Sequence, residues 1–143
     1  MEKIKISVLV VSPPGISQQM LGQTFCCRDD VYFKGIADGG LSALKMIRRS
    51  LPQMLVINSD LPESEAAELI REIRDQDTRP LIILLVETSG HLPRAAQAHP
   101  DLIVRSYELP ARLDALFREA RTRWHGLNHT GVLLDDRSGA EEE

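Results

Sequence analysis

Short apolar runs recur along this chain and alternate with segments in which apolar residues are spaced as in a helix. The clearest runs, Ile6–Val11 and Leu81–Val86, consist almost entirely of β-branched residues and leucine. Runs of this length are typical of strands buried on both faces, because a strand with one face in water alternates apolar and polar residues. Three further runs predict strands at Val31–Ala37, 54–57 and 102–104.

Helical patterns fill the intervals between these runs. Pro62 is well placed at a helix start, because its missing amide hydrogen would be unsatisfied there, and the acidic Glu63 and Glu65 suit the positive end of the helix dipole. Five strands alternating with five helices predict an α/β protein, a doubly wound five-stranded parallel sheet with helices on both faces. The expected apolar helix faces are Ile16, Met20, Leu21 and Phe25; Leu41, Leu44, Ile47 and Leu51; Ala66, Leu69, Ile70 and Ile73; a short helix within 92–99; and Leu113, Leu116, Phe117, Ala120 and Trp124.

The size and composition of the chain limit its organisation. With 143 residues, 43% of them hydrophobic, we expect one globular domain at 1–125 and a flexible acidic tail at 126–143. A formal net charge of −4 supplies no global attraction to nucleic acid. No apolar run approaches the roughly 20 residues of a membrane span, and no signal-peptide pattern precedes the first strand, so the expected location is the cytoplasm.

The two cysteines, Cys26 and Cys27, are neighbours in sequence. Because adjacent cysteines rarely bridge each other, we expect two reduced thiols. A pair partly buried at a helix end is favoured over a redox sensor, because Arg28 is the only adjacent basic residue that could lower a thiol pKa.

In open parallel sheets, ligands bind beyond the carboxyl ends of the strands. The residues that follow the strands are therefore the first candidates for a site. They are Ser12 and Pro13 after the first strand, Asn58 after the third, residues 85–88 after the fourth, and Arg105 and Ser106 after the fifth.

Four stretches carry recognisable patterns in a fixed order along the chain. They are the apolar residues 8–11; residues 37–44, ADGGLSAL; residues 51–62, LPQMLVINSDLP; and residues 104–107, VRSY. In this order they resemble the receiver domains of two-component response regulators, in which a similar first strand is followed by A-D-G-x-x-A-L, x-P-D-L-V-L-L-D-x-x-L-P and V-K-P-F. The resemblance covers about residues 4–124. It implies a flavodoxin-like fold with strand order 2-1-3-4-5.

The resemblance also implies a phosphorylation pocket with defined chemistry. In that family two acidic residues hold Mg²⁺, an aspartate accepts the phosphoryl group, and a hydroxyl residue and a lysine bind its oxygens. All five positions differ in this chain. The acidic pair corresponds to Ser12 and Pro13, the acceptor to Asn58, the hydroxyl residue to Leu85 (or Val86 if the register slips) and the lysine to Arg105.

These differences predict a pseudo-receiver that keeps the fold and has lost aspartyl phosphorylation. The Asn58 amide has no anionic oxygen to attack a phosphohistidine, and Ser12 and Pro13 supply no carboxylate ligand for Mg²⁺. We therefore expect no catalytic residue, no metal, no cofactor and no enzymatic activity. Two alternatives remain open: phosphorylation of Asp60, for which a solvated loop residue is the simpler interpretation, and a small-molecule-binding domain that uses loops 12–15 and 58–62.

The expected function is protein–protein contact in bacterial two-component signalling, and the resemblance places this contact near the last strand and helix. Tyr107 sits at the family's switch aromatic position, and Arg112 belongs to a basic cluster on the last helix. The structural alternatives are a tyrosine with a packed ring and a wet hydroxyl, and a solvated helix face. The expected partner is a signalling protein such as a histidine kinase or an output protein; a homodimer through the last strand and helix is also open, and neither nucleic acid nor membrane is expected.

Overall fold

A five-stranded parallel sheet lies at the centre of the computed structural model, which describes residues 5–76, 80–87 and 94–130. The strand order is β2-β1-β3-β4-β5, and every neighbouring pair is parallel. The predicted fold class and strand order are confirmed. The strands are β1 (Ile6–Val11), β2 (Val31–Ala37), β3 (Met54–Asn58), β4 (Leu81–Val86) and β5 (Leu102–Arg105).

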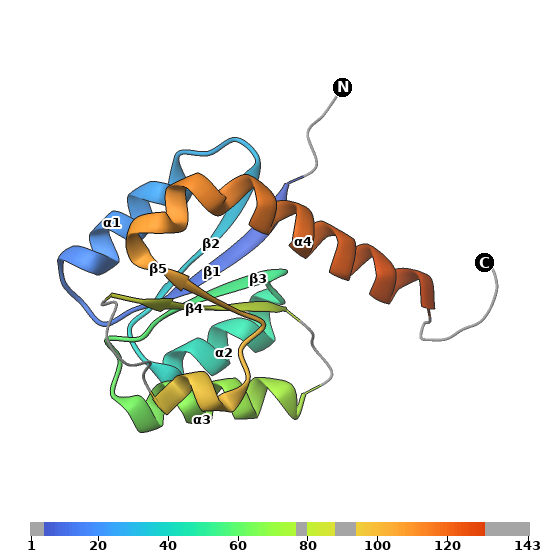
Figure 1. Cartoon of the computed structure of the whole chain (residues 1–143). Helices are drawn as coiled ribbons and strands as arrows, with labels where there is room; N and C mark the ends of the chain where they lie inside the picture. The colour runs from blue at the N-terminus through green and yellow to red at the C-terminus, as the bar shows by residue number, and fades with distance from the viewer. Residues whose placement is uncertain (1–4, 77–79, 88–93, 131–143) are drawn as a thin grey trace.

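Helices cover both faces of this sheet (Figure 1). The helices α1 (Ile16–Cys26) and α4 (Leu109–Thr130) lie on one face, and α2 (Gly40–Ser50) and α3 (Glu63–Arg74) lie on the other. Successive strand residues point to opposite faces, so Leu9 packs in the core below α2 and α3 while Val8 packs in the core below α1 and α4. Each strand with two buried faces needs apolar residues throughout, which explains the continuous apolar runs.

Two of the predicted apolar helix faces were wrong in part. On α1, Leu21 and Phe25 are buried, but Ile16 is 76% exposed and Met20 is 62% exposed. At about 100° per residue, Ile16 lies on the opposite side of the helix from Phe25, so the four residues never shared one face. On α2 the buried residues are Gly40, Ala43 and Ile47, while Leu41 and Leu51 are exposed.

The region after β4 also differs from the prediction. A 3₁₀-helix, η1 (Arg94–Ala98), stands where a short fourth α-helix was expected, and residues 88–93 lie outside the described part of the chain. A second 3₁₀-helix, η2 (Ser106–Glu108), leads directly into α4.

The last helix passes the predicted end of the domain. It begins at Leu109 and continues to Thr130, five residues beyond residue 125. The rest of the predicted tail, 131–143, lies outside the described residues. Within the described ranges, no helix combines the length and the apolar character needed to cross a membrane.

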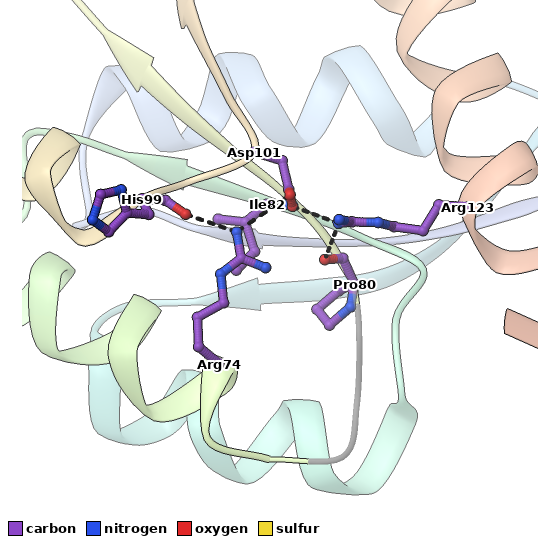
Figure 2. A network of polar contacts seen from close by, with 6 residues as sticks. All are labelled: Arg74, Pro80, Ile82, His99, Asp101 and Arg123. Carbon is purple, nitrogen blue, oxygen red and sulfur yellow. Dashed lines mark hydrogen bonds and ion pairs between the residues drawn. The ribbon is translucent and has the colours of Figure 1, made fainter. Parts of the chain in front are cut away.

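Asp101 is the centre of a network of hydrogen bonds and ion pairs at the end of the sheet where β4 and β5 begin (Figure 2). Its Oδ2 accepts hydrogen bonds from the Ile82 amide at 2.7 Å and from Nη1 of Arg123 at 2.6 Å. Its Oδ1 lies 3.3 Å from Nη2 of Arg74. Because Arg74 belongs to α3 and Arg123 to α4, one carboxylate connects the helix layers on both faces of the sheet.

The protonation of Asp101 follows from these contacts. Burial alone would raise its pKa, but the hydrogen bonds from Arg123 and the Ile82 amide, together with the charges of Arg123 and Arg74, lower the pKa below its usual value. The two arginines also donate to backbone carbonyls, Arg123 to Pro80 and Arg74 to His99. The Asp101 network therefore connects the start of β4, at Pro80 and Ile82, to the chain that leads into β5, at His99 and Asp101.

Candidate functional site

The sheet brings most of the predicted site residues to the edge formed by the carboxyl ends of its strands. Ser12 directly follows β1, and Asn58 is the last residue of β3. Asn58 pairs in register with Leu85 of β4, and Val86 pairs with Arg105 at the end of β5. Parallel strands end on the same side of a sheet, so these positions lie along the same edge, with β3 and β4 between the strand of Ser12 and that of Arg105.

Ser12 and Asn58 are in direct contact at this edge. Nδ2 of Asn58 donates a hydrogen bond to Oγ of Ser12 at 3.1 Å. The two residues are 0% and 1% exposed, and among the residues whose burial is described they are the only polar ones that are buried. The contact is therefore a neutral, desolvated hydrogen bond at the position where the resembled family has charged groups.

The remaining polar atoms of this pair are also engaged. Oδ1 of Asn58 accepts a hydrogen bond from the amide of Asp60 at 3.0 Å, which shapes the turn between β3 and α3. The hydroxyl of Ser12 donates to the carbonyl of Pro13 at 3.2 Å. Buried polar groups are costly without partners, so these bonds stabilise the pair as a structural unit.

The loop after β1 is held by a side chain from α1. Nε2 of Gln18 donates to the carbonyl of Ser12 at 2.9 Å and to Oδ1 of Asp38 at 2.8 Å. Asp38 is an exposed residue after β2, and it is a single carboxylate. Nowhere in the described ranges do three or more His, Cys, Asp or Glu side chains group so that they could hold a metal ion. The donor set at Ser12 and Pro13 does not fit Mg²⁺, which prefers carboxylate and water oxygens.

Leu85, Val86 and Arg105 stand at the positions that the resemblance assigns to the hydroxyl residue and the lysine, and their surroundings differ from one another. Leu85 is buried in the apolar core below α1 and α4, and Val86 is buried in the opposite core. Arg105 is partly exposed at the end of β5. Ser106, which directly follows β5, donates a hydrogen bond from its Oγ to Oε2 of Glu87, which directly follows β4, at 2.8 Å.

Asp60 lies beside the edge but not within it. The residue is exposed in the loop between β3 and α3, and its backbone, not its carboxylate, is the group bonded to Asn58. The loops 12–15 and 58–62 are the predicted alternative ligand-binding segments. They line neither a groove of about 830 Å³ between α2 and α3 nor a groove of about 300 Å³ between α1 and the start of α4.

Tyr107 and Arg112 are both on the surface. Tyr107, in η2, is 75% exposed, so its ring is not packed as the structural alternative expected. Arg112 is exposed on the first turns of α4. Tyr107 borders a groove of about 300 Å³ whose other lining includes Met20 of α1 and Leu109 of α4.

Sequence reasoning missed the contribution of α1 to this surface. Met20 is exposed beside the groove, although it was assigned to the apolar core face. The angle between residues around the helix would have predicted this exposure, because Met20 lies about 140° around α1 from the buried Phe25.

The comparisons with known proteins agree with this architecture. No model of a known protein family matches the chain. Over 80 residues, 56% of the chain, it is 31% identical to a protein-glutamate methylesterase/protein-glutamine glutaminase of Paramagnetospirillum magneticum. Over 118 residues it is 25% identical to a protein of the same name from Syntrophus aciditrophicus. The matches span only 22% and 34% of the lengths of those two relatives.

Solved structures resemble the chain over most of its length. The signal receiver domain of the putative response regulator NarL from Mycobacterium tuberculosis superimposes with a TM-score of 0.69 at 17% identity, covering 82% of this chain and 98% of that one. The receiver domain of a sensor histidine kinase from Pseudomonas aeruginosa, solved with magnesium in its active-site cleft, gives 0.68 at 21% identity, with coverages of 85% and 98%. The response regulator domain of Thermotoga maritima CheB gives 0.64 at 16%, with coverages of 82% and 95%. By its architecture and its structural neighbours, this chain has the receiver-domain fold of two-component response regulators.

Proposed function

We propose that this chain is a receiver-like signalling protein that acts by contact with a protein partner and is not phosphorylated on an aspartate. The observation that carries the proposal is the buried, neutral pair Asn58–Ser12. Phosphoryl transfer to a receiver needs an ionised nucleophile and cations that neutralise the charge of the transferring group. An amide that is hydrogen-bonded on both of its polar atoms supplies neither.

The rest of the pocket supports the same function. The Leu85 side chain cannot donate a hydrogen bond to a phosphoryl oxygen, and Pro13 adds no ligand to the loop after β1. Without a phosphoryl group, any switching depends on a partner that binds two states of the chain with different affinity. A single-state adaptor satisfies the same observations.

The exposed surface around Tyr107 is the proposed contact site. Tyrosine and methionine are enriched at protein interfaces, and here Tyr107 and Met20 are both exposed and both line one groove. Arg112, three residues after the groove residue Leu109 on α4, adds an exposed cation. The proposed partner is a signalling protein such as a histidine kinase or an output protein, met in the cytoplasm; a second copy of the chain is the alternative. The enzymatic activity in the names of the curated relatives is not part of this proposal.

A direct test is intact-mass spectrometry after incubation with acetyl phosphate and Mg²⁺. The expected result is no added phosphate, while the Pseudomonas aeruginosa receiver domain in a parallel reaction is labelled. In parallel, beryllofluoride and Mg²⁺ are added to ¹⁵N-labelled protein, and the amide resonances of residues 58–60 are expected to stay in place. A phosphorylated species would overturn the proposal. If Asp60→Asn abolished that species and Asp38→Asn did not, the acceptor would be Asp60.

A further inference from the structure

Two thiols lie side by side on the surface, away from the candidate site. Cys26 is the last residue of α1, and Cys27 follows it. Both residues are exposed, and their Sγ atoms are 3.5 Å apart. The prediction of a partly buried pair was wrong, because the end of α1 turns both side chains to solvent. The chain contains only these two cysteines.

We propose that Cys26 and Cys27 form a chelating site for monosubstituted trivalent arsenicals. The proposal depends on the separation of the two sulfur atoms, on their exposure and on the groups around them. It is independent of the receiver-like function.

The separation of the sulfur atoms selects the geometry of the bound centre. A thiophilic atom holds thiolate sulfur at about 2.3 Å, as zinc does. With two such bonds, the 3.5 Å between the Sγ atoms corresponds to a sulfur–centre–sulfur angle of about 100°. A linear two-coordinate centre would need about 4.6 Å between the sulfur atoms at the same bond length. An angle near 100° is that of a pyramidal centre with three bonds, which trivalent arsenic has.

A disulfide bond and a zinc site both fit the geometry of the two cysteines less well than an arsenical does. A disulfide requires the sulfur atoms to close to about 2.05 Å and prefers Cα atoms about 4.4–6.8 Å apart. Neighbouring Cα atoms across a trans peptide are only about 3.8 Å apart, so closing the bond strains the chain. Zinc prefers four protein ligands at a structural site, and the described residues offer no cluster of three or more ligands that includes these cysteines. A monosubstituted arsenical brings its third ligand with it.

The surroundings of Cys26 favour the neutral thiol. The hydrogen bond with Cys27, followed by partial desolvation and the charge of Cys27, raises the pKa of Cys26. The guanidinium of the adjacent Arg28 is held by Asp30 at 2.8 Å and by Asp114 at 3.1 Å. Each protonated thiol forms one sulfur–arsenic bond and releases its proton to an arsenic-bound hydroxyl, which leaves as water. Two thiols and one R–As(OH)₂ therefore give R–As(S)₂ and two waters, with no change of oxidation state.

The test uses the reduced full-length chain and phenylarsine oxide. The expected product is one adduct by intact mass, a gain of C₆H₅As less two hydrogens, with both thiols lost to Ellman's reagent. The adduct should survive an excess of 2-mercaptoethanol and be removed by dithiothreitol. Cys26→Ser and Cys27→Ser each keep one exposed thiol, and they should bind the probe on the order of 100-fold more weakly, because the second bond of a chelate is intramolecular.

Iodoacetamide, which reacts with single thiols, separates the possible failures. It is expected to label both cysteines of the unmodified chain and the one remaining cysteine of each variant. Full labelling by iodoacetamide without a phenylarsine adduct would overturn the chelate, as would adducts of equal stability on the single-serine variants. Zn²⁺ retained on the unmodified chain after desalting, but not on the variants, would overturn the pyramidal assignment.

Discussion

The amide of Asn58 donates to the hydroxyl of Ser12 across 3.1 Å, and both residues are almost completely buried. They lie at the ends of adjacent parallel strands, 46 residues apart in the chain. The carboxyl ends of β1 and β3 are therefore joined by a neutral, desolvated hydrogen bond. The pair is therefore expected to stabilise the fold, and its removal can be measured.

The side chains of Ser12 and Asn58 are expected to be energetically coupled. Ser12→Ala leaves Nδ2 of Asn58 without its partner in a buried site, so it should lower the free energy of unfolding by about 1–3 kcal/mol. In a double-mutant cycle with Asn58→Ala, measured by urea unfolding, a coupling energy of about 1 kcal/mol is expected. Strictly additive effects would show that the hydrogen bond contributes nothing.

Placing a carboxylate at position 58 should destabilise the chain. In Asn58→Asp the new carboxylate takes a position that is 1% exposed, so burial raises its pKa, and a rise of roughly two units costs about 3 kcal/mol at pH 7. Because the folded pKa exceeds the unfolded value, this loss should be absent below about pH 4 and grow as the pH rises through the folded pKa. Ser59→Asp, next in the chain and half-exposed, is the matched control and should change stability much less. Chemical unfolding at pH 4 and pH 7 makes the comparison.

The Asp101 network should contribute to stability at neutral pH and lose its contribution in acid. The pKa of Asp101 is lowered, so its stabilisation is present above the unfolded value, about 3.9, and is lost as the pH falls through the folded pKa. Asp101→Asn should cost about 2 kcal/mol at pH 7, between the values for exposed and buried ion pairs. The difference from the unmodified chain should shrink below pH 4.

A control for this pH profile is Asp75→Asn, which neutralises an exposed carboxylate at the end of α3. Because Asp75 is exposed, this substitution should change the free energy of unfolding at pH 7 by no more than about 0.5 kcal/mol. A constant loss for Asp101→Asn across the whole range would show that the charge of Asp101 is not what stabilises the network.

Gly39 and Glu65 are expected to be coupled at the start of α2. Oε2 of Glu65 accepts a hydrogen bond from the amide of Gly40 at 2.6 Å, and a Cβ at position 39 would lie 2.5 Å from the same oxygen. Gly39→Ala should therefore displace this capping carboxylate and cost about 1 kcal/mol. In the Glu65→Ala background the same substitution should cost almost nothing. An equal cost in both backgrounds, by urea unfolding, would contradict the steric argument.

Tyr107→Ala separates recognition from stability. The residue is exposed, so the free energy of unfolding should change by no more than about 0.5 kcal/mol. Its removal should weaken partner binding or, if the partner is a second copy, self-association measured by sedimentation. Tyr32→Ala, at the other tyrosine of the chain, is the control, because Tyr32 is also exposed but lies on the edge strand β2. If both substitutions weakened binding or self-association equally, Tyr107 would not be part of the contact site.

The sequence alone determined the strands, their parallel arrangement and the positions of Ser12, Asn58 and Arg105 at the carboxyl ends of strands. These follow from local properties: continuous apolar runs specify strands with two buried faces, and the carboxyl ends of parallel strands meet at one edge. The absence of a carboxylate at position 58 was also visible in the sequence.

Only the tertiary structure decided which distant groups pair and which side chains at the ends of the elements face solvent. It has η1 in place of a predicted α-helix, and it exposes both thiols of the cysteine pair. It also brought Arg123 to Asp101 and Asn58 to Ser12. Such contacts join residues far apart in the chain, and each depends on the direction of a side chain once its element has packed, which periodicity along the sequence does not encode.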